Sequence, residues 1–265
     1  MIRKSFFSFA LIFIFTFCVF AQQKLIMIGG GERPASILSK LTELSGGDKG
    51  KMLVITWAGG DPKASFQAFK EDVEKISKIE LVFAPVSPLN DEAKAKFLQQ
   101  LKDASGVFFT GGDQNRVMDV LKDETLLKAI VEKYNSGTVF SGTSAGTAIM
   151  SKIMITGEGD FKVIDGNKVE TRDGIGLLPQ VIVDQHFIVR QRENRLFGLI
   201  LKNPSLLGIG IDEDTAFYVS DNRFGEVLGD SQVMILDARN KSNELKIFLL
   251  KPLEKFDLKK RKRKK

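Results

Sequence analysis

Short apolar runs alternate with stretches of helical periodicity along the first half of the chain. The runs are too short for helices and predict buried strands, which lie at Lys24–Ile28, Met52–Ile55, Glu80–Phe83, Val107–Phe109 and Thr138–Ser141. Between the runs, apolar residues recur every three or four positions, the spacing of one helix face, as in Phe66, Phe69, Val73 and Ile76. Strands that alternate with helices predict an α/β fold of the flavodoxin-like kind, with helices on both faces of a parallel sheet.

The second half of the chain is richer in strands than in helices. Residues 190–201 have the pattern of a helix, and apolar runs predict strands at Ile153–Thr156, Val181–Val183, Leu207–Ile211 and Ala216–Val219. From residue 226 to 250 apolar runs alternate with turn residues, which is typical of antiparallel strands at the edge of a sheet. No internal repeat or linker interrupts the chain, so we predict a single α/β domain over residues 22–258.

The N-terminal segment differs from this body. Residues 1–21 combine Arg3 and Lys4 with an apolar run of about 15 residues and end at Ala21, the pattern of a cleaved signal peptide. The run is short for a membrane span of about 20 residues, so we predict export to the periplasm or the medium, with no membrane span after cleavage. Cys18, the one cysteine, lies in this segment, and the mature chain should therefore lack disulfides and thiol catalysis.

The net charge of +6 belongs to the ends of the chain. Residues 259–265 carry seven positive charges and the N-terminal segment carries two, which leaves the body a formal charge of about −3. A nucleic-acid-binding surface spread over the domain is therefore not indicated. Because like charges repel, we expect residues 259–265 to be a disordered basic tail, either a solvated terminus or an attachment to an anionic surface or polymer.

The strongest chemical motif follows the fifth predicted strand. The sequence Gly142-Thr143-Ser144-Ala145-Gly146 joins that strand to a helix-compatible stretch and holds a serine with a glycine two residues away on each side. In a nucleophile elbow the serine has a strained backbone, and such glycines let strand and helix approach each other. Ser144 would then be exposed at a helix N-terminus, with the N–H of Ala145 facing a developing oxyanion. A glycine-rich turn without chemistry is the alternative interpretation of this motif alone.

Only one histidine is available to activate that serine. It is His186, which follows a predicted strand as Ser144 does, so the two can meet at the same edge of the sheet. A histidine base needs an acidic partner, and spacing does not choose among Glu158, Asp160, Asp184, Asp212 and Glu213. Gly112, in the loop after the fourth strand, is the natural second oxyanion donor. With one histidine and no mature cysteine, neither a metal centre nor a cofactor is expected.

Four motifs in order resemble those of the cyanophycinases. They are Gly111-Gly112-Asp113-Gln114, Gly142–Gly146, Asp184-Gln185-His186-Phe187 with the arginines after it, and Gly208–Glu213. Cyanophycinases are serine peptidases related to dipeptidase E, on a fold similar to class I glutamine amidotransferases. The resemblance covers roughly residues 24–235. It implies hydrolysis of cyanophycin, a polyaspartate whose side chains carry arginine through isopeptide bonds, to β-Asp-Arg dipeptides.

The resemblance also implies roles for single residues. Ser144 becomes the nucleophile, His186 the base and Glu158 the third member of a triad. Five residues fall where the family contacts its substrate, namely Gln114, Asp184, Arg190, Arg192 and Arg195. Their chemistry fits, because the arginine ends of the substrate pair with carboxylates and its free carboxylates pair with guanidinium groups. An exposed helix start is the alternative interpretation of the three arginines.

Two other functions stay open at this point. A dipeptidase for aspartyl or isoaspartyl dipeptides would share the triad and differ in the pocket. A secreted non-catalytic binding protein would keep the fold, although it has no need of Ser144, His186 and Gly112 together. The assembly is also open, with a homodimer among the options.

Overall fold

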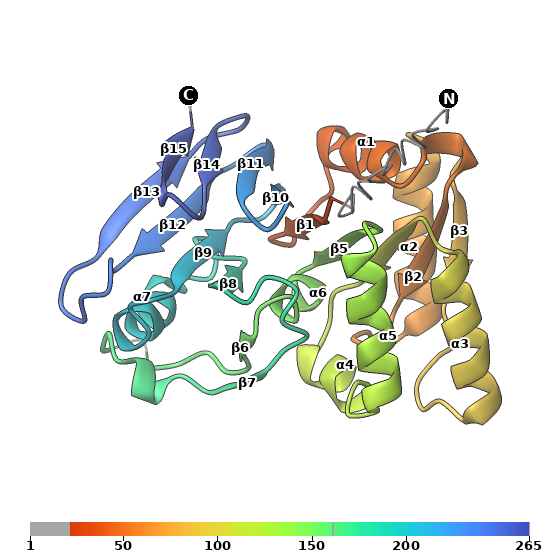
Figure 1. Cartoon of the computed structure of the whole chain (residues 1–265), viewed down its shortest axis with the longest axis horizontal. Helices are drawn as coiled ribbons and strands as arrows, with labels where there is room; N and C mark the ends of the chain where they lie inside the picture. Colours follow the sequence, from red (N-terminus) through yellow and green to blue (C-terminus); the bar gives the residue numbers. More distant parts are fainter. Residues whose placement is uncertain (1–21, 161, 265) are drawn as a thin grey trace, which may run out of the picture.

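The computed structural model describes residues 22–160 and 162–264, so the expected signal peptide lies outside the described residues. Its main sheet has nine strands in the order β15-β14-β11-β10-β1-β5-β4-β2-β3 (Figure 1). Five strands are parallel to one another: β1 Lys24–Ile28, β2 Lys51–Ile55, β3 Glu80–Phe83, β4 Gly106–Phe109 and β5 Val139–Thr143. The predicted α/β class with a parallel central sheet is confirmed.

Helices cover both faces of the parallel strands, because each helix buries one apolar side. One face carries α1 (Ala35–Leu44) and α2 (Pro62–Glu74), and the other carries α3 (Asp91–Asp103), α4 (Gln114–Val120) and α5 (Glu124–Asn135) (Figure 1). Four helix starts have a side chain that accepts a hydrogen bond from the first turn, those of Asp61, Asn90, Asp113 and Asp123. A short 3₁₀ helix, Gly47–Lys49, follows α1.

Beyond β1 the main sheet continues with antiparallel strands, one of which, Phe224–Gly229, overlaps the region 226–250 where antiparallel strands were predicted. They are β10 (Thr215–Ser220), β11 (Phe224–Gly229), β14 (Lys255–Asp257) and β15 (Lys262–Lys264). Because β10 runs opposite to β1, its first residues lie beside the last residues of β1, and Ala216 pairs with Ile28. The turn before β10 therefore reaches the edge at which the parallel strands end.

A second sheet of four strands lies beside the first, in the order β13-β12-β9-β8. Its strands are β8 (Val181–Gln185), β9 (Leu207–Ile211), β12 (Val233–Asp237) and β13 (Lys246–Leu250). One face packs on α7 (Glu193–Lys202). The remaining elements are α6 (Ala145–Ala148), a hairpin of β6 (Ile153–Ile155) and β7 (Thr171–Asp173), and a 3₁₀ helix at Gly166–Lys168.

One apolar core joins the two sheets. It contains Phe140 from the main sheet and Ile209 and Ile235 from the second sheet, all fully buried. The rings of Phe248 on β13 and Phe256 on β14 meet edge to face, with centroids 5.0 Å apart. The late strands are thus held to the parallel sheet by burial as well as by backbone hydrogen bonds.

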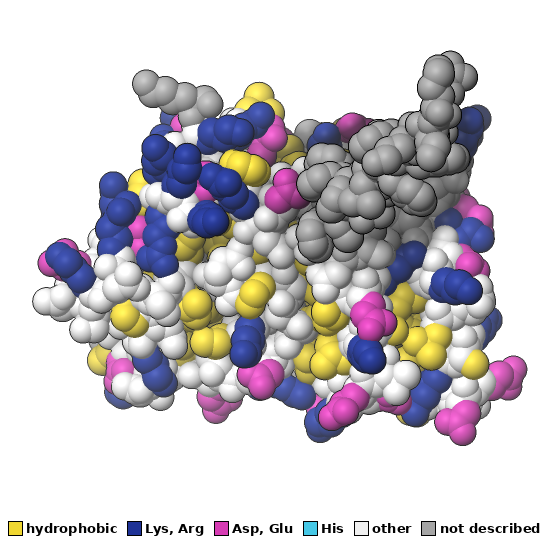
Figure 2. Space-filling model, viewed as in Figure 1, with side chains coloured by type: hydrophobic (Ala, Val, Ile, Leu, Met, Phe, Trp, Pro, Cys, Tyr) yellow, Lys and Arg dark blue, Asp and Glu magenta, His cyan; other side chains and the backbone are white. Residues whose placement is uncertain are grey.

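The basic C-terminal segment, expected to be disordered, is ordered through residue 264. Residues 262–264 form β15, which pairs antiparallel with β14. Acidic side chains offset its charge, since Arg261 pairs with Asp237 at 2.7 Å and Arg263 with Glu254 at 2.8 Å. Figure 2 shows Lys and Arg side chains gathered over this part of the molecule. Within residues 22–264, apart from the undescribed residue 161, no helix is long and apolar enough to cross a membrane.

Candidate active site

Ser144 occupies a sharp turn between the end of β5 and the start of α6. Its backbone has φ 53° and ψ −113°, a left-handed conformation that is strained for a residue with a side chain. The glycines on either side permit this turn. A Cβ at Gly142 would lie 2.2 Å from the carbonyl oxygen of Gly146, and a Cβ at Gly146 would lie 2.3 Å from that of Phe109. The geometry is that of a nucleophile elbow.

Ser144, His186 and Glu213 form a continuous chain of hydrogen bonds. Ser144 Oγ lies 2.8 Å from His186 Nε2, and His186 Nδ1 lies 2.5 Å from Glu213 Oε1. His186 follows β8 directly, and Glu213 lies in the turn before β10. In this arrangement the imidazole can take the serine proton while the carboxylate holds it in the required tautomer.

The imidazole of His186 is packed tightly and is only 8% exposed. Gly30, with φ 110°, makes room for the ring, because a Cβ there would lie 2.1 Å from Cε1 of the histidine. Burial lowers the pKa of His186, and the nearby charges of Arg190 and Arg192 lower it further, whereas Glu213 acts in the opposite direction. The histidine is therefore neutral at pH 7 and able to act as a base.

Glu158, expected as the third member of the triad, does not contact His186. Its carboxylate instead pairs with Arg192 at 2.5 Å and with Arg195 at 3.3 Å. Although burial raises the pKa of Glu158, the hydrogen bond from Arg192 and the arginine charges bring it below its usual value. The acid that touches the imidazole is Glu213, which was one of the five candidates in the sequence.

Two of the three arginines and Asp184, all expected to contact substrate, are almost fully buried and held in ion pairs. Arg195 makes two hydrogen bonds to Asp184, of 2.6 and 2.8 Å, and the exposed fractions are 4% for the arginine and 1% for the aspartate. Arg192, also 4% exposed, is bonded to Glu158 and to the carbonyl oxygen of Gln185. These pairs tie the start of α7 to the end of β8, next to His186.

Arg190 and Gln114 remain accessible near this cluster. Arg190 is exposed, and its charge lowers the pKa of both His186 and Glu158. Gln114 is half-buried at the first position of α4 and donates a 2.9 Å hydrogen bond to the carbonyl oxygen of Ile155, so its own side-chain oxygen stays available. Of the five predicted substrate residues, these two can reach a ligand.

The two expected oxyanion donors lie close to the serine. Ala145 is the first residue of α6, and among the described residues neither its N–H nor that of Gly112 donates a hydrogen bond. The loop that holds Gly112 touches the nucleophile, since a Cβ at Gly111 would lie 3.4 Å from Ser144 Cβ. Two unpaired N–H groups near Ser144 fit the stabilisation of a tetrahedral oxyanion.

A cavity of about 280 Å³ opens at Ser144 and His186, and Arg33 and Thr110 also line it. The sequence did not indicate Arg33, whose guanidinium is held by Asp72 at 2.5 Å. It also did not indicate Gln185, whose side-chain oxygen lies 3.4 Å from Ser144 Oγ. A larger cavity of about 670 Å³ lies farther along the same edge, past the ends of β2 and β3.

A serine, a histidine and a glutamate at the carboxyl edge of a parallel sheet are the arrangement of a serine hydrolase. The chain belongs to peptidase family S51, whose model matches residues 25–227. It is thus a serine-type peptidase.

Two relatives similar to this chain are cyanophycinases. That of Trichormus variabilis is 33% identical over 216 residues, which are 80% of this chain and 72% of that protein. That of Synechococcus elongatus is 33% identical over 238 residues, 87% of this chain and 74% of that protein. The resemblance to cyanophycinases is confirmed.

More distant matches support the same family and fold. Peptidase E of Pasteurella multocida is 25% identical over 177 residues, 64% of this chain and 73% of that protein. The crystal structure of a peptidase from an acI-B1 actinobacterium superposes with a TM-score of 0.67 at 24% identity, covering 89% of this chain and 96% of that chain. The fold is therefore shared with a solved peptidase.

Proposed function

We propose that this protein is an exported serine exopeptidase that hydrolyses cyanophycin to β-Asp-Arg dipeptides. The observation that carries the proposal is the series of hydrogen bonds from Ser144 through His186 to Glu213. It occurs in a protein that is similar to cyanophycinases over most of its length. Export rests on the signal-peptide pattern of residues 1–21 and would give access to polymer released from other cells. No nucleic acid or cofactor takes part in the reaction.

The reaction proceeds through an acyl-enzyme. His186 Nε2 takes the proton of Ser144 as its oxygen attacks the scissile carbonyl carbon. The N–H groups of Gly112 and Ala145 hold the oxyanion of the tetrahedral intermediate. His186 then gives the proton to the leaving amine, and water releases the acyl group by the same steps in reverse order.

The substrate contacts follow from the accessible charges. Arg190 is exposed beside the histidine and fits the free carboxylate of an arginine unit, and the side-chain oxygen of Gln114 can accept a hydrogen bond from the substrate. Asp184, Arg192 and Arg195 act by fixing the loop that carries His186.

A dipeptidase for aspartyl or isoaspartyl dipeptides is the second candidate. The match to peptidase E and the small cavity at Ser144 favour it. This enzyme would use the same triad and would leave the polymer intact.

The deciding experiment is the product spectrum of the protein with cyanophycin and, in parallel, with a panel of Asp-X and β-Asp-X dipeptides. We expect soluble β-Asp-Arg from the polymer, and we expect Ser144→Ala to lose on the order of 10⁶ in turnover. Ser65→Ala is the matched control, because Ser65 lines the same cavity and lies outside the triad.

Each other outcome has its own meaning. Cleavage of dipeptides with untouched polymer would establish the dipeptidase. Near-normal turnover by Ser144→Ala would exclude the serine mechanism, and no turnover of either substrate would point to a secreted binding protein. N-terminal sequencing of protein recovered outside the cells tests cleavage after Ala21.

A further inference from the structure

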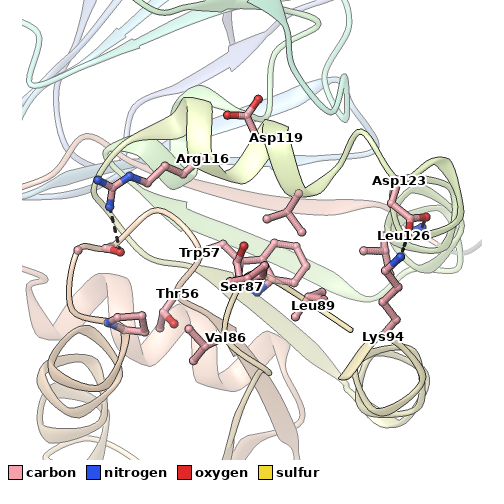
Figure 3. Close-up of a pocket in the computed structure, with 15 residues that line it drawn as sticks. Thr56, Trp57, Val86, Ser87, Leu89, Lys94, Arg116, Asp119, Asp123 and Leu126 are labelled. Carbon is pink, nitrogen blue, oxygen red and sulfur yellow. Dashed lines mark hydrogen bonds and ion pairs between the residues drawn. The ribbon is translucent and has the colours of Figure 1, made fainter. Parts of the chain in front are cut away.

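A second cavity, larger than the one at Ser144, has no member of the triad in its lining. It has a volume of about 670 Å³ and lies past the ends of β2 and β3, between the loop that follows β2, the loop that follows β3 and the helices α4 and α5 (Figure 3). This volume is within the range of ligand sites, and its walls are apolar with a few charged groups. Nothing in the triad chemistry requires such a cavity.

Apolar groups form the middle of this cavity. Trp57 lies at its centre in Figure 3, held by a 2.8 Å hydrogen bond from its indole N–H to the carbonyl oxygen of Pro85 and by its contact with Phe97. Val86, which is 41% exposed, and Leu89 lie beside it. Trp57 is only 4% exposed and forms the floor, so an aliphatic chain laid over Val86 and Leu89 would remove apolar surface from water.

Four charged side chains line the cavity. Lys94 and Asp123 pair with each other at 2.9 Å, and the other two lie on α4. Arg116 and Asp119 are three residues apart, so they lie on the same side of the helix. Arg116 is exposed, and the one hydrogen bond of its guanidinium among the described residues is a 3.5 Å contact to the carbonyl oxygen of Gly59.

Among the described residues, Asp119 pairs with the exposed Lys122 at 3.0 Å and with the half-buried Arg172 at 3.3 Å. Asp119 is itself exposed, so such pairs exchange at little cost.

The cavity adjoins the small cavity at Ser144 across a single loop. The oxyanion loop rests on its wall, because a Cβ at Gly112 would lie 2.1 Å from the carbonyl oxygen of Ala58 and 3.0 Å from the nitrogen of Gly59. Gly59 lines the large cavity, and Gly111 lines the small cavity at Ser144. The loop that holds Gly111 and Gly112 therefore separates the two cavities and touches both.

We propose that this cavity binds a β-aspartyl-arginine unit of the polymer beyond the two units that flank the scissile bond. Such a unit carries one free carboxylate and one guanidinium, joined by an aliphatic chain. The carboxylate pairs with Arg116, the guanidinium with Asp119, and the methylene groups lie over Val86 and Leu89. This inference rests on the proposed cyanophycinase function and adds a preference for long substrates.

The test compares soluble oligomers of two and four β-Asp-Arg units, since only the longer one reaches the cavity. In the unaltered protein we expect kcat/KM to be at least about tenfold higher for the four-unit oligomer than for the two-unit oligomer. One charge-assisted contact is enough to give a difference of this size. Arg116→Gln and, separately, Asp119→Asn should raise KM for the four-unit oligomer about five- to tenfold and leave kcat/KM for the two-unit oligomer unchanged.

Lys128→Gln is the matched control, because it also removes one positive charge, from an exposed residue of α5 outside the cavity. It should leave both oligomers unaffected. Equal kinetics on the two oligomers in the unaltered protein, or a preference for the longer one that survives Arg116→Gln and Asp119→Asn, would overturn the inference while leaving the exopeptidase proposal intact. Failure of the unaltered protein to cleave either oligomer would instead contradict the exopeptidase proposal.

Discussion

At the scale of single residues, the role of each acidic side chain near the site is set by the group that it touches. Glu213 reaches the imidazole of His186, Glu158 reaches two arginines, and Asp184 reaches one of them. A carboxylate on the imidazole stabilises the imidazolium that forms during the reaction, whereas a carboxylate on a buried guanidinium removes the cost of an unpaired charge. Similar residues therefore serve catalysis in one case and local structure in the other.

This division predicts different effects for two matched substitutions. Glu213→Gln should lower kcat about 10⁴-fold, because the imidazole loses its tautomer and its counter-charge. Glu158→Gln keeps the triad intact and should cost less than about tenfold, with a loss of stability from the freed Arg192. Steady-state kinetics and urea unfolding of both variants check this. A larger loss of kcat for Glu158→Gln than for Glu213→Gln would restore Glu158 as the catalytic acid.

The lowered pKa of His186 predicts the pH dependence. Catalysis needs the neutral imidazole, so kcat/KM should fall only as the pH drops below the usual histidine value of about 6.5. Arg190→Gln removes a nearby positive charge, which raises the pKa of His186 and should move this acid limb to higher pH. Lys128→Gln, the same charge change on a distant surface, should leave the limb in place. If the fall in kcat/KM moves to lower pH in Arg190→Gln, His186 is not the group whose protonation causes it.

The sequence contains Glu213 but no signal that selects it over Glu158. Glu213 is selected by the loop at residues 29–31, which bonds both to His186 and to the residue after Glu213. His186 N–H donates to the carbonyl oxygen of Gly29, and Asp214 N–H donates to that of Gly30. These contacts join residues more than 150 positions apart in the chain, and periodicity within a short window carries no information on them.

At the scale of elements, the strand-turn-helix unit around Ser144 depends on close backbone contact. Gly146 touches the carbonyl of Phe109 on the neighbouring strand β4, and Gly142 touches Gly146. Thr147 lies on the short helix after Ser144, and its buried hydroxyl lies 2.7 Å from the carbonyl oxygens of Ile28 and Gly142. The hydroxyl is thus accommodated by backbone acceptors from β1 and β5.

Adding one methyl group at the elbow should therefore be costly. Gly146→Ala is expected to destabilise the protein by about 1–3 kcal/mol or more and to reduce turnover, because strand and helix must separate. Gly60→Ala is the control, since a Cβ there meets nothing within 4 Å. The midpoint of urea unfolding measures both effects. Equal midpoints for the two variants would mean that the elbow is not tightly packed.

At the scale of the whole molecule, the position of the late strands decides where the site forms. The antiparallel direction of β10 brings Glu213 to the carboxyl edge of β1, and β8 in the second sheet brings His186 to the same edge. The shared core, including Phe248 and Phe256, holds both sheets in this relation. Catalysis therefore requires the second sheet to stay docked.

Because the two sheets share an apolar core, we predict a single unfolding transition. Circular dichroism and the fluorescence of Trp57, which lies by the parallel strands, should give the same midpoint during urea unfolding. Phe256→Ala, which empties the contact between the sheets, should lower stability by about 3–5 kcal/mol and preserve the coincidence of the two probes. Separate midpoints in the unaltered protein would show two independently folding units and would contradict the predicted single domain.

By itself, the amino-acid sequence determined the features that depend on local chemistry. Apolar periodicity located the five parallel strands and the helices between them other than α4, the glycine spacing around Ser144 predicted the elbow, and the single histidine identified the base. The tertiary structure decided which acid completes the triad, which arginines are buried as ion pairs, that β8, β9, β12 and β13 form a second sheet, and that residues 262–264 are a paired strand. The physical reason is the sequence distance of the contacts. Strand direction, sheet order and ion pairing join residues far apart in the chain, and burial of the whole core selects among the possible pairings.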